Sequence, residues 1–294
     1  MKNSFYRSLS ALAVISCLMI SVLSAHAQAT SDVRSKMTVP DSAHLQIVTL
    51  RDGSTIYGRI VSVSADTVTF QTGAGGMQLA AGAIGEIKVI PTSDLHEGSY
   101  WFPNPNSTRL FFAPTGQMLK QGEGYVSDYE LFFPGIAYGL TDNISIGGGI
   151  SLIPASASDQ AYYFTPKVGF SVSEQVHLAA GVLLAGTRGG TGGVYYGVGT
   201  LGDGNGSVTL GGGYGFAGGK IQRKPAGMLG AEKRISRRIS VVTENYLLPV
   251  DHDNTVYSFG LRFMGEKITT DLALFNTANS GVIGFPWVDF VFRF

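Results

Sequence analysis

Alternation of apolar and polar residues dominates the C-terminal two thirds of the chain. From Ser107 to Phe294 every second residue tends to be apolar, in runs separated by turn-forming residues. Because successive side chains of a strand point to opposite faces, this period of two predicts β-strands. The predicted strands are 107–113, 123–140, 143–153, 161–171, 175–186, 192–201, 206–217, 226–235, 238–249, 255–265, 268–276 and 283–294.

The connections between these runs alternate in length. The short ones lie at 141–143, 173–174, 236–237 and 266–267, and 202–206 joins them by its order in the chain. The wider ones are 154–160, 188–193, 217–224, 251–254 and 276–281. Membrane β-barrels have short periplasmic turns and longer external loops. An even number of about twelve strands therefore predicts an antiparallel up-and-down transmembrane β-barrel, with both ends in the periplasm.

The two faces of the strands differ in chemistry. In 143–153, 175–186 and 206–217, apolar or aromatic residues share one face, and in 143–153 and 206–217 Ser, Thr and Gly fill most of the other. The apolar faces should meet lipid, and charged residues should point inward, since Arg or Lys facing lipid at midplane costs about 2–4 kcal/mol. The candidate lumen charges are Glu244, Arg262, Asp271, Asp289 and Arg293.

A two-residue turn at Glu266-Lys267 would place Arg262 opposite Asp271, within reach of Glu244. Two interpretations stay open. The favoured one is a ladder of ion pairs that fills the interior, because balanced charges select weakly. The other is a charged constriction that selects permeating solutes.

The last run, from Trp287 to Phe294, places Phe290, Phe292 and Phe294 on one face and charged residues on the other. A soluble β-sandwich would also alternate, with its apolar face inward. This ending, however, resembles the C-terminal strand of bacterial outer-membrane proteins. The resemblance implies contact with outer-membrane lipid and recognition of the terminal aromatic residues by the barrel-assembly machinery.

The N-terminus has the pattern of a secretory signal peptide. Lys2 and Arg7 precede an apolar run over 9–23, which ends in Ala25-His26-Ala27. Cleavage after residue 27 is favoured over an uncleaved span, for which the run is short, and over a lipoprotein acylated at Cys17. Because Cys17 is the only cysteine, cleavage leaves no disulfide, catalytic thiolate or cysteine metal site.

Residues 28–43 are polar and predict a flexible leader. Residues 44–90 alternate in short runs with an Asp52-Gly53 hairpin signal, which predicts five short strands able to close a small barrel. This module resembles SH3-like and Sm-like β-domains through LRDGSTIYGRI and VSVSADTVTF. That resemblance transfers no function, so a structural or protein-contact role is favoured.

Residues 91–106 predict a linker because they hold three prolines and no strand pattern. Trp101 and Phe102 would either anchor the linker at the membrane interface or pack on the small module.

Charge and histidine content narrow the function. The mature chain keeps 19 cationic against 21 acidic residues, which gives no reason to expect nucleic acid as a partner. Some outer-membrane barrels are phospholipases or proteases, but His177 and His252 are the only histidines of the barrel, so no catalytic site and no cofactor are expected. The preferred function is a porin-like passive channel for small solutes. The alternative is an anchor whose module binds a periplasmic protein or the cell wall, and a lipid hydrolase is the third choice.

Overall fold

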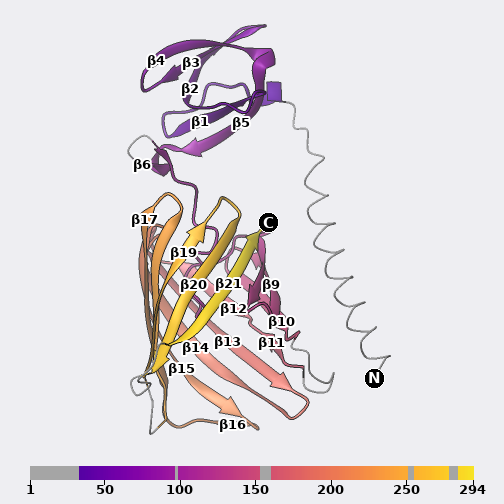
Figure 1. Ribbon diagram of the computed structural model, residues 1–294, viewed down its shortest axis with the longest axis vertical. Helices are drawn as coiled ribbons and strands as arrows, with labels where there is room; N and C mark the ends of the chain where they lie inside the picture. Colours follow the sequence, from indigo (N-terminus) through magenta and orange to yellow (C-terminus); the bar gives the residue numbers. More distant parts are fainter. Residues whose placement is uncertain (1–32, 97–98, 153–159, 251–254, 278–283) are drawn as a thin grey trace, which may run out of the picture. The chain divides into compact units, whose positions relative to one another are not determined.

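The computed structural model describes residues 33–96, 99–152, 160–250, 255–277 and 284–294 (Figure 1). The chain divides into two compact units, Met1–Tyr100 and Trp101–Phe294. Apart from the short 3-10 turns Val33–Lys36, Ala81–Ala83 and Thr92–Asp94, the regular structure of these ranges is all β. None of the helices in these ranges is long and apolar enough to cross a membrane. The predicted signal peptide lies outside the described residues.

The first unit contains one five-stranded antiparallel sheet in the order β4-β3-β2-β1-β5. Val48, Ile60 and Phe70 fill its core and are completely buried. Gly53 adopts φ +88° in the turn after β1, which explains why the Asp-Gly pair was a reliable hairpin signal. The strands are β1 His44–Leu50, β2 Thr55–Val63, β3 Thr67–Thr72, β4 Gly75–Ala80 and β5 Ile84–Pro91, and a two-stranded ribbon follows with β6 Leu95–His96 and β7 Ser99–Tyr100.

Strands β4 and β5 form the two edges of this sheet. No backbone ladder joins these edges among the described residues, so closure of the five strands into a small barrel stays a prediction. The likeness of the module to SH3-like domains stays a prediction.

The second unit is a closed antiparallel barrel of twelve strand positions (Figure 1). Strands β11 and β12 share one position, because both pair with β10 on one side and β13 on the other. Strand β8 pairs with β21 and closes the ring. The strands are β8 Gly124–Tyr129, β9 Phe133–Thr141, β10 Ile144–Ile150, β11 Tyr162–Phe164, β12 Lys167–Ser171, β13 Val176–Thr187, β14 Gly190–Gly202, β15 Gly206–Ala217 with the short β16 Lys220–Ile221, β17 Ala226–Ser236, β18 Ile239–Leu247, β19 Thr255–Met264, β20 Ile268–Thr277 and β21 Phe285–Arg293.

The predicted strand count is confirmed, but two errors cancel in it. The predicted first strand, 107–113, is not part of the barrel wall, and the predicted second strand, 123–140, is two strands joined at Glu130 and Leu131. Both turn residues have positive φ, 54° and 64°, although neither is a glycine. Without Gly, Asn or Pro the sequence gives no turn signal here.

The ring closes between Gly124 and Phe294, whose backbones exchange two hydrogen bonds of 3.1 and 2.9 Å. A last strand beside a first strand at 107–113 would have placed Phe294 near Ser107, but β21 pairs with β8 instead. Because the start of β8 lies beside the end of β21, the first and the last barrel strand begin and end at the same opening of the barrel. We call this opening the near end. The opposite side is the distal end.

The predicted faces of the wall are confirmed. Leu210 and Phe259 on the outer face are 66% and 62% exposed, whereas Thr209 and Ser240 on the inner face are fully buried. One predicted wide connection is wrong: β13 ends at Thr187 and β14 begins at Gly190, because the glycine-rich residues extend the strands. The connections 153–159, 251–254 and 278–283 lie outside the described residues.

Candidate functional site: the barrel lumen

Residues 101–122 run inside the barrel and are here called the lumen insert. The insert makes a tight turn over Leu110–Ala113, where the Leu110 amide donates to the Ala113 carbonyl at 2.8 Å, and Arg109 pairs with Pro114 across it. Leu110 and Phe111 are buried against the inner wall. The alternation that predicts a first wall strand therefore belongs to a segment enclosed by the barrel. Such a segment alternates too, because one of its sides packs on the apolar wall and the other contacts polar groups.

The insert starts at Trp101 and Phe102, which are held by Arg234 of β17. The Arg234 guanidinium carbon lies 4.9 Å from the centroid of each ring, and its Nη1 donates to the Phe102 carbonyl at 2.7 Å. Phe102 is only 2% exposed. Both rings therefore pack on an arginine of the barrel, a contact that neither expectation for these aromatics included.

Arg262 of β19 is the centre of the lumen contacts. Its Nε and Nη2 donate to the two carboxylate oxygens of Asp271 at 2.8 Å each, across the β19–β20 pair in which the two residues are opposite. Its Nη1 donates to Glu232 at 2.7 Å. The same guanidinium also donates to the carbonyls of Asn106 and Leu110 at 3.0 and 2.7 Å. One arginine thus joins three wall strands to the insert, using its planar set of donors.

Glu244 does not reach Arg262, contrary to expectation. The residue of β18 opposite Arg262 is Ser240, and Glu244 lies four residues farther toward the distal end. Its Oε2 accepts hydrogen bonds from the Phe112 and Ala113 amides at 2.9 and 3.0 Å, so this carboxylate satisfies the turn of the insert. Its Oε1 accepts from the Tyr246 hydroxyl at 2.5 Å.

Asp289 of β21 binds an arginine of the insert. Arg109 Nη2 lies 2.5 Å from Asp289 Oδ2, and the guanidinium stands 4.7 Å from the Tyr129 ring centroid and 5.6 Å from that of Tyr125. Asp289 is also opposite Asp271 in the β20–β21 pair. Arg109 and Arg262 therefore neutralise two adjacent carboxylates that would otherwise repel each other.

Arg293 is not a deep lumen residue. It binds Glu123 at 2.5 Å at the near end, where the two side chains are 22% and 34% exposed. Phe290 is 38% exposed on the outer face, and Phe292 and Phe294 are half-buried.

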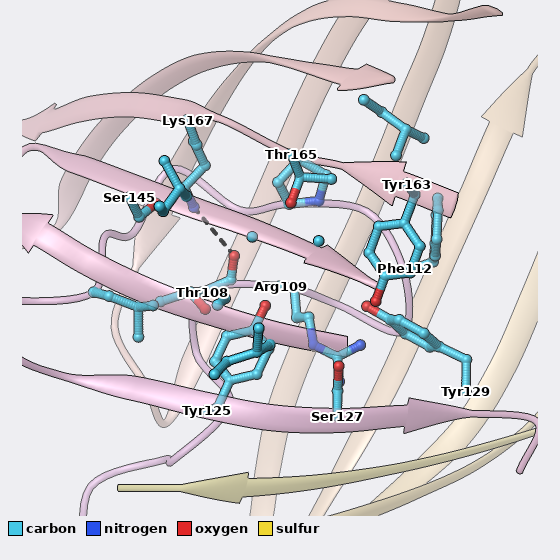
Figure 2. A pocket seen from close by; sticks show the side chains of 18 of the residues that line it. Thr108, Arg109, Phe112, Tyr125, Ser127, Tyr129, Ser145, Tyr163, Thr165 and Lys167 are labelled. Carbon is cyan, nitrogen blue, oxygen red and sulfur yellow. Dashed lines mark hydrogen bonds between the residues drawn. The ribbon is translucent and has the colours of Figure 1, made fainter. Parts of the chain in front are cut away.

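Lys167 of β12 completes the contacts on the opposite wall. Its Nζ donates to the carbonyls of Thr108, Thr115 and Gln117 at 3.3, 3.1 and 2.7 Å. Figure 2 shows Lys167 and Arg109 reaching into a pocket of about 90 Å³ beside the insert, next to Tyr125, Tyr129 and Tyr163. Because Lys167 Nζ donates to three backbone carbonyls of the insert, it fixes the insert backbone to β12.

Sequence reasoning missed four buried charges at the contacts between insert and wall: Arg109 of the insert, and Lys167, Glu232 and Arg234 of the wall. Parity was a usable signal for three of them, because Glu232 and Arg234 alternate with outward residues on β17, as Lys167 does on β12. Parity gives no such signal for Arg109, because the alternation of residues 107–113 predicts a wall strand.

A second, larger cavity of about 460 Å³ lies on the distal side of the insert turn. Its walls come from strands β13, β14, β15 and β17 to β21, and Phe112, Ala113 and Pro114 of the insert contribute to its lining. It is lined mainly by apolar side chains.

Of the two barrel histidines, His177 lies in the described part of the chain. His177 Nδ1 lies 2.8 Å from Ser171 Oγ, and its backbone carbonyl approaches Gly116 of the insert so closely that a Cβ there would lie 2.2 Å from it. Glycine at 116 is therefore a packing requirement. His252 lies outside the described residues, among which no group of three or more His, Cys, Asp or Glu side chains is arranged to hold a metal ion.

A scan against protein-family models and a search of curated proteins gave no match. Among solved structures, the chain is similar to a KdgM porin in complex with disordered oligogalacturonate, at 9% identity and a TM-score of 0.45 over 58% of this chain and 98% of the porin. The NanC porin matches at 11% identity and a TM-score of 0.39, over 58% and 97% of the chains. The outer-membrane protein Omp33 of Acinetobacter baumannii matches at 9% and 0.37, over 58% and 96%. These likenesses concern the β-barrel architecture alone.

Proposed function

We propose that this chain is an outer-membrane, porin-like barrel whose lumen is closed at rest by its own insert, with the N-terminal unit in the periplasm. The barrel itself supports the membrane location. Its outer face carries exposed large apolar side chains on many strands, and the buried charges lie on its inner face. A closed ring leaves no unpaired strand edge, which is what a bilayer requires of β-structure.

The observation that carries the proposal is the set of bonds between insert and wall. Residues of β12, β14, β17, β18, β19 and β21 each bond directly to the insert. A twelve-stranded barrel is intermediate between those filled by side chains and those with an open channel. Here the filling comes from a separate segment. Passive flow of solutes therefore requires displacement of the insert.

The second candidate, an anchor that contacts a periplasmic protein or the cell wall, is favoured by the first unit. That unit has its own buried core and is joined directly in sequence to the start of the insert. A partner that holds the unit would pull on residues 101–122. Anchoring and gating are therefore compatible functions of one connection.

Conductance in a planar lipid bilayer tests the proposal. The full chain should be silent, whereas replacement of residues 105–118 by a Gly-Ser linker of equal length should produce steady channels. Replacement of residues 28–43 by a Gly-Ser linker is the matched control and should stay silent. Steady channels from the full chain would refute closure at rest, and silence of the 105–118 replacement would refute a porin-like lumen.

Recognition by the barrel-assembly machinery remains part of the proposal. Deleting Phe294 removes the last residue of the ring closure with Gly124 and the proposed terminal aromatic signal. We expect the amount of folded protein in the outer membrane to fall severalfold. Replacement by Tyr should retain it, and equal loss with Tyr would contradict recognition through a terminal aromatic residue.

A further inference from the structure

The distal half of the lumen departs from the usual pattern of a membrane barrel. Barrel interiors are ordinarily polar, with the apolar side chains turned to lipid. In this chain the inner positions of the distal half include Val194, Val198, Met228 and Val256, which line the cavity of about 460 Å³. Nothing in the closure of a barrel requires apolar residues here.

Aromatic rings form one side of this cavity. The Phe275 and Trp287 ring centroids lie 5.4 Å apart, and Phe112 of the insert meets Trp287 edge to face at 6.4 Å. Tyr196 and Tyr246 add two more rings to the lining. A concave, apolar and aromatic cavity of a few hundred Å³ is the usual form of a small-molecule site.

The charges around the cavity specify the class of ligand. Among the described residues that line it there is no Lys or Arg, and Glu244 is the one ionisable carboxylate. This carboxylate already accepts bonds from the Phe112 and Ala113 amides and from the Tyr246 hydroxyl. An anionic ligand would find no counter-charge here and would face Glu244. A neutral molecule meets no such penalty.

We infer that the cavity is a binding site for a neutral, apolar small molecule of hydrocarbon character, seated on the turn of the lumen insert. This inference deepens the proposed function, because the segment that closes the lumen also contributes Phe112, Ala113 and Pro114 to the site. A bound molecule would contact Phe112 and so act directly on the segment that must move for passage.

Trp287 provides the measurement. The chain has two tryptophans, and Trp101→Phe leaves Trp287 as the only one while keeping a ring beside Arg234. In protein reconstituted in lipid nanodiscs, 1-bromodecane should quench Trp287 fluorescence saturably, with a stoichiometry of one per barrel. A quench that rises linearly without saturation would mean partition into lipid only and would overturn the inference.

Cavity-filling variants with a matched control locate the site. Val194→Phe and Val256→Phe, made separately in the Trp101→Phe background, should each weaken binding of 1-bromodecane at least tenfold. Val208→Phe makes the same change on the outer face, where Val208 is exposed, and should leave binding unchanged. Each variant is first shown to be folded by its β-sheet circular dichroism. If both cavity variants bind like the control, the site is not this cavity.

The ligand class is tested with 10-bromodecanoate, which has a similar chain length and a negative charge. It should bind at least tenfold more weakly than 1-bromodecane at neutral pH. Tighter binding of the anion would overturn the assignment to neutral molecules. None of these measurements requires ion flow, so silence of the 105–118 replacement in bilayers would refute the porin-like lumen without affecting the binding result.

Discussion

The near and distal halves of the lumen are built from the same strands but differ in chemistry. In the near half Arg262, Asp271 and Glu232 hold the insert through charged hydrogen bonds, and each is buried. In the distal half, the wall of the larger cavity is mainly apolar and leaves space next to the insert. The difference shows that one inner wall can both fix a segment in place and leave room beyond it.

The largest expected effect is in the near half. Arg262→Met should lower the free energy of unfolding by about 3–5 kcal/mol, because it leaves Asp271 and Glu232 buried without their shared cation. Guanidinium titration of the protein in lipid vesicles measures this loss. The same variant should open channels in planar bilayers. A loss below about 1 kcal/mol would mean that the charged half does not hold the insert.

Apolar packing of the insert is tested by Leu110→Ala. Leu110 is buried, and Gly230 leaves it room, since a Cβ at 230 would lie 2.2 Å from Leu110 Cδ1. We expect a loss of about 2–5 kcal/mol in the same titration, from transfer and cavity terms. The outward Leu210→Ala is the control and should cost less in unfolding. Equal losses would mean that the insert is not packed.

A smaller effect is expected at the boundary between the halves. Glu244→Gln keeps an acceptor for the two amides of the insert turn but removes the negative charge, so the loss should be about 1 kcal/mol. Because the cavity then lacks its carboxylate, 10-bromodecanoate should bind more tightly than to the unchanged chain. An unchanged preference for 1-bromodecane would show that Glu244 does not exclude anions.

The smallest effect is expected at the rim. Arg293→Gln breaks an ion pair with Glu123 that is similar in chemistry to that of Arg262 but partly exposed. The loss in free energy of unfolding should stay below about 1 kcal/mol, because water solvates the remaining carboxylate. If Arg293→Gln lost as much free energy of unfolding as Arg262→Met, burial would not explain why the two ion pairs differ.

The sequence predicted the wall well because a period of two directly reflects which face meets lipid. It predicted the Arg262–Asp271 juxtaposition for the same reason, since a two-residue turn determines the register. The position of the insert was not predictable in this way. Residues 107–113 alternate like a strand, and only contacts more than a hundred residues away, such as that of Leu110 with Arg262, place them inside.

The partners of Glu244 show the same limit. Local pairing gives the neighbours of a residue across one ladder, but the lumen is crossed by the insert, and Glu244 meets two of its backbone amides. The apolar cavity was also unexpected. Each inward valine or methionine is ordinary on its own strand. The sequence does not show that they line one cavity, because only the closed ring brings their strands around a common space.

The ion pair between Arg109 and Asp289 spans 180 residues of sequence, from just before the first barrel strand to the last one. The insert is therefore synthesised first and finds its final partner only when the C-terminal strand is in place. Folding with such distant contacts is slow. The strand that pairs with β8 to close the ring thus also carries the last wall partner of the insert.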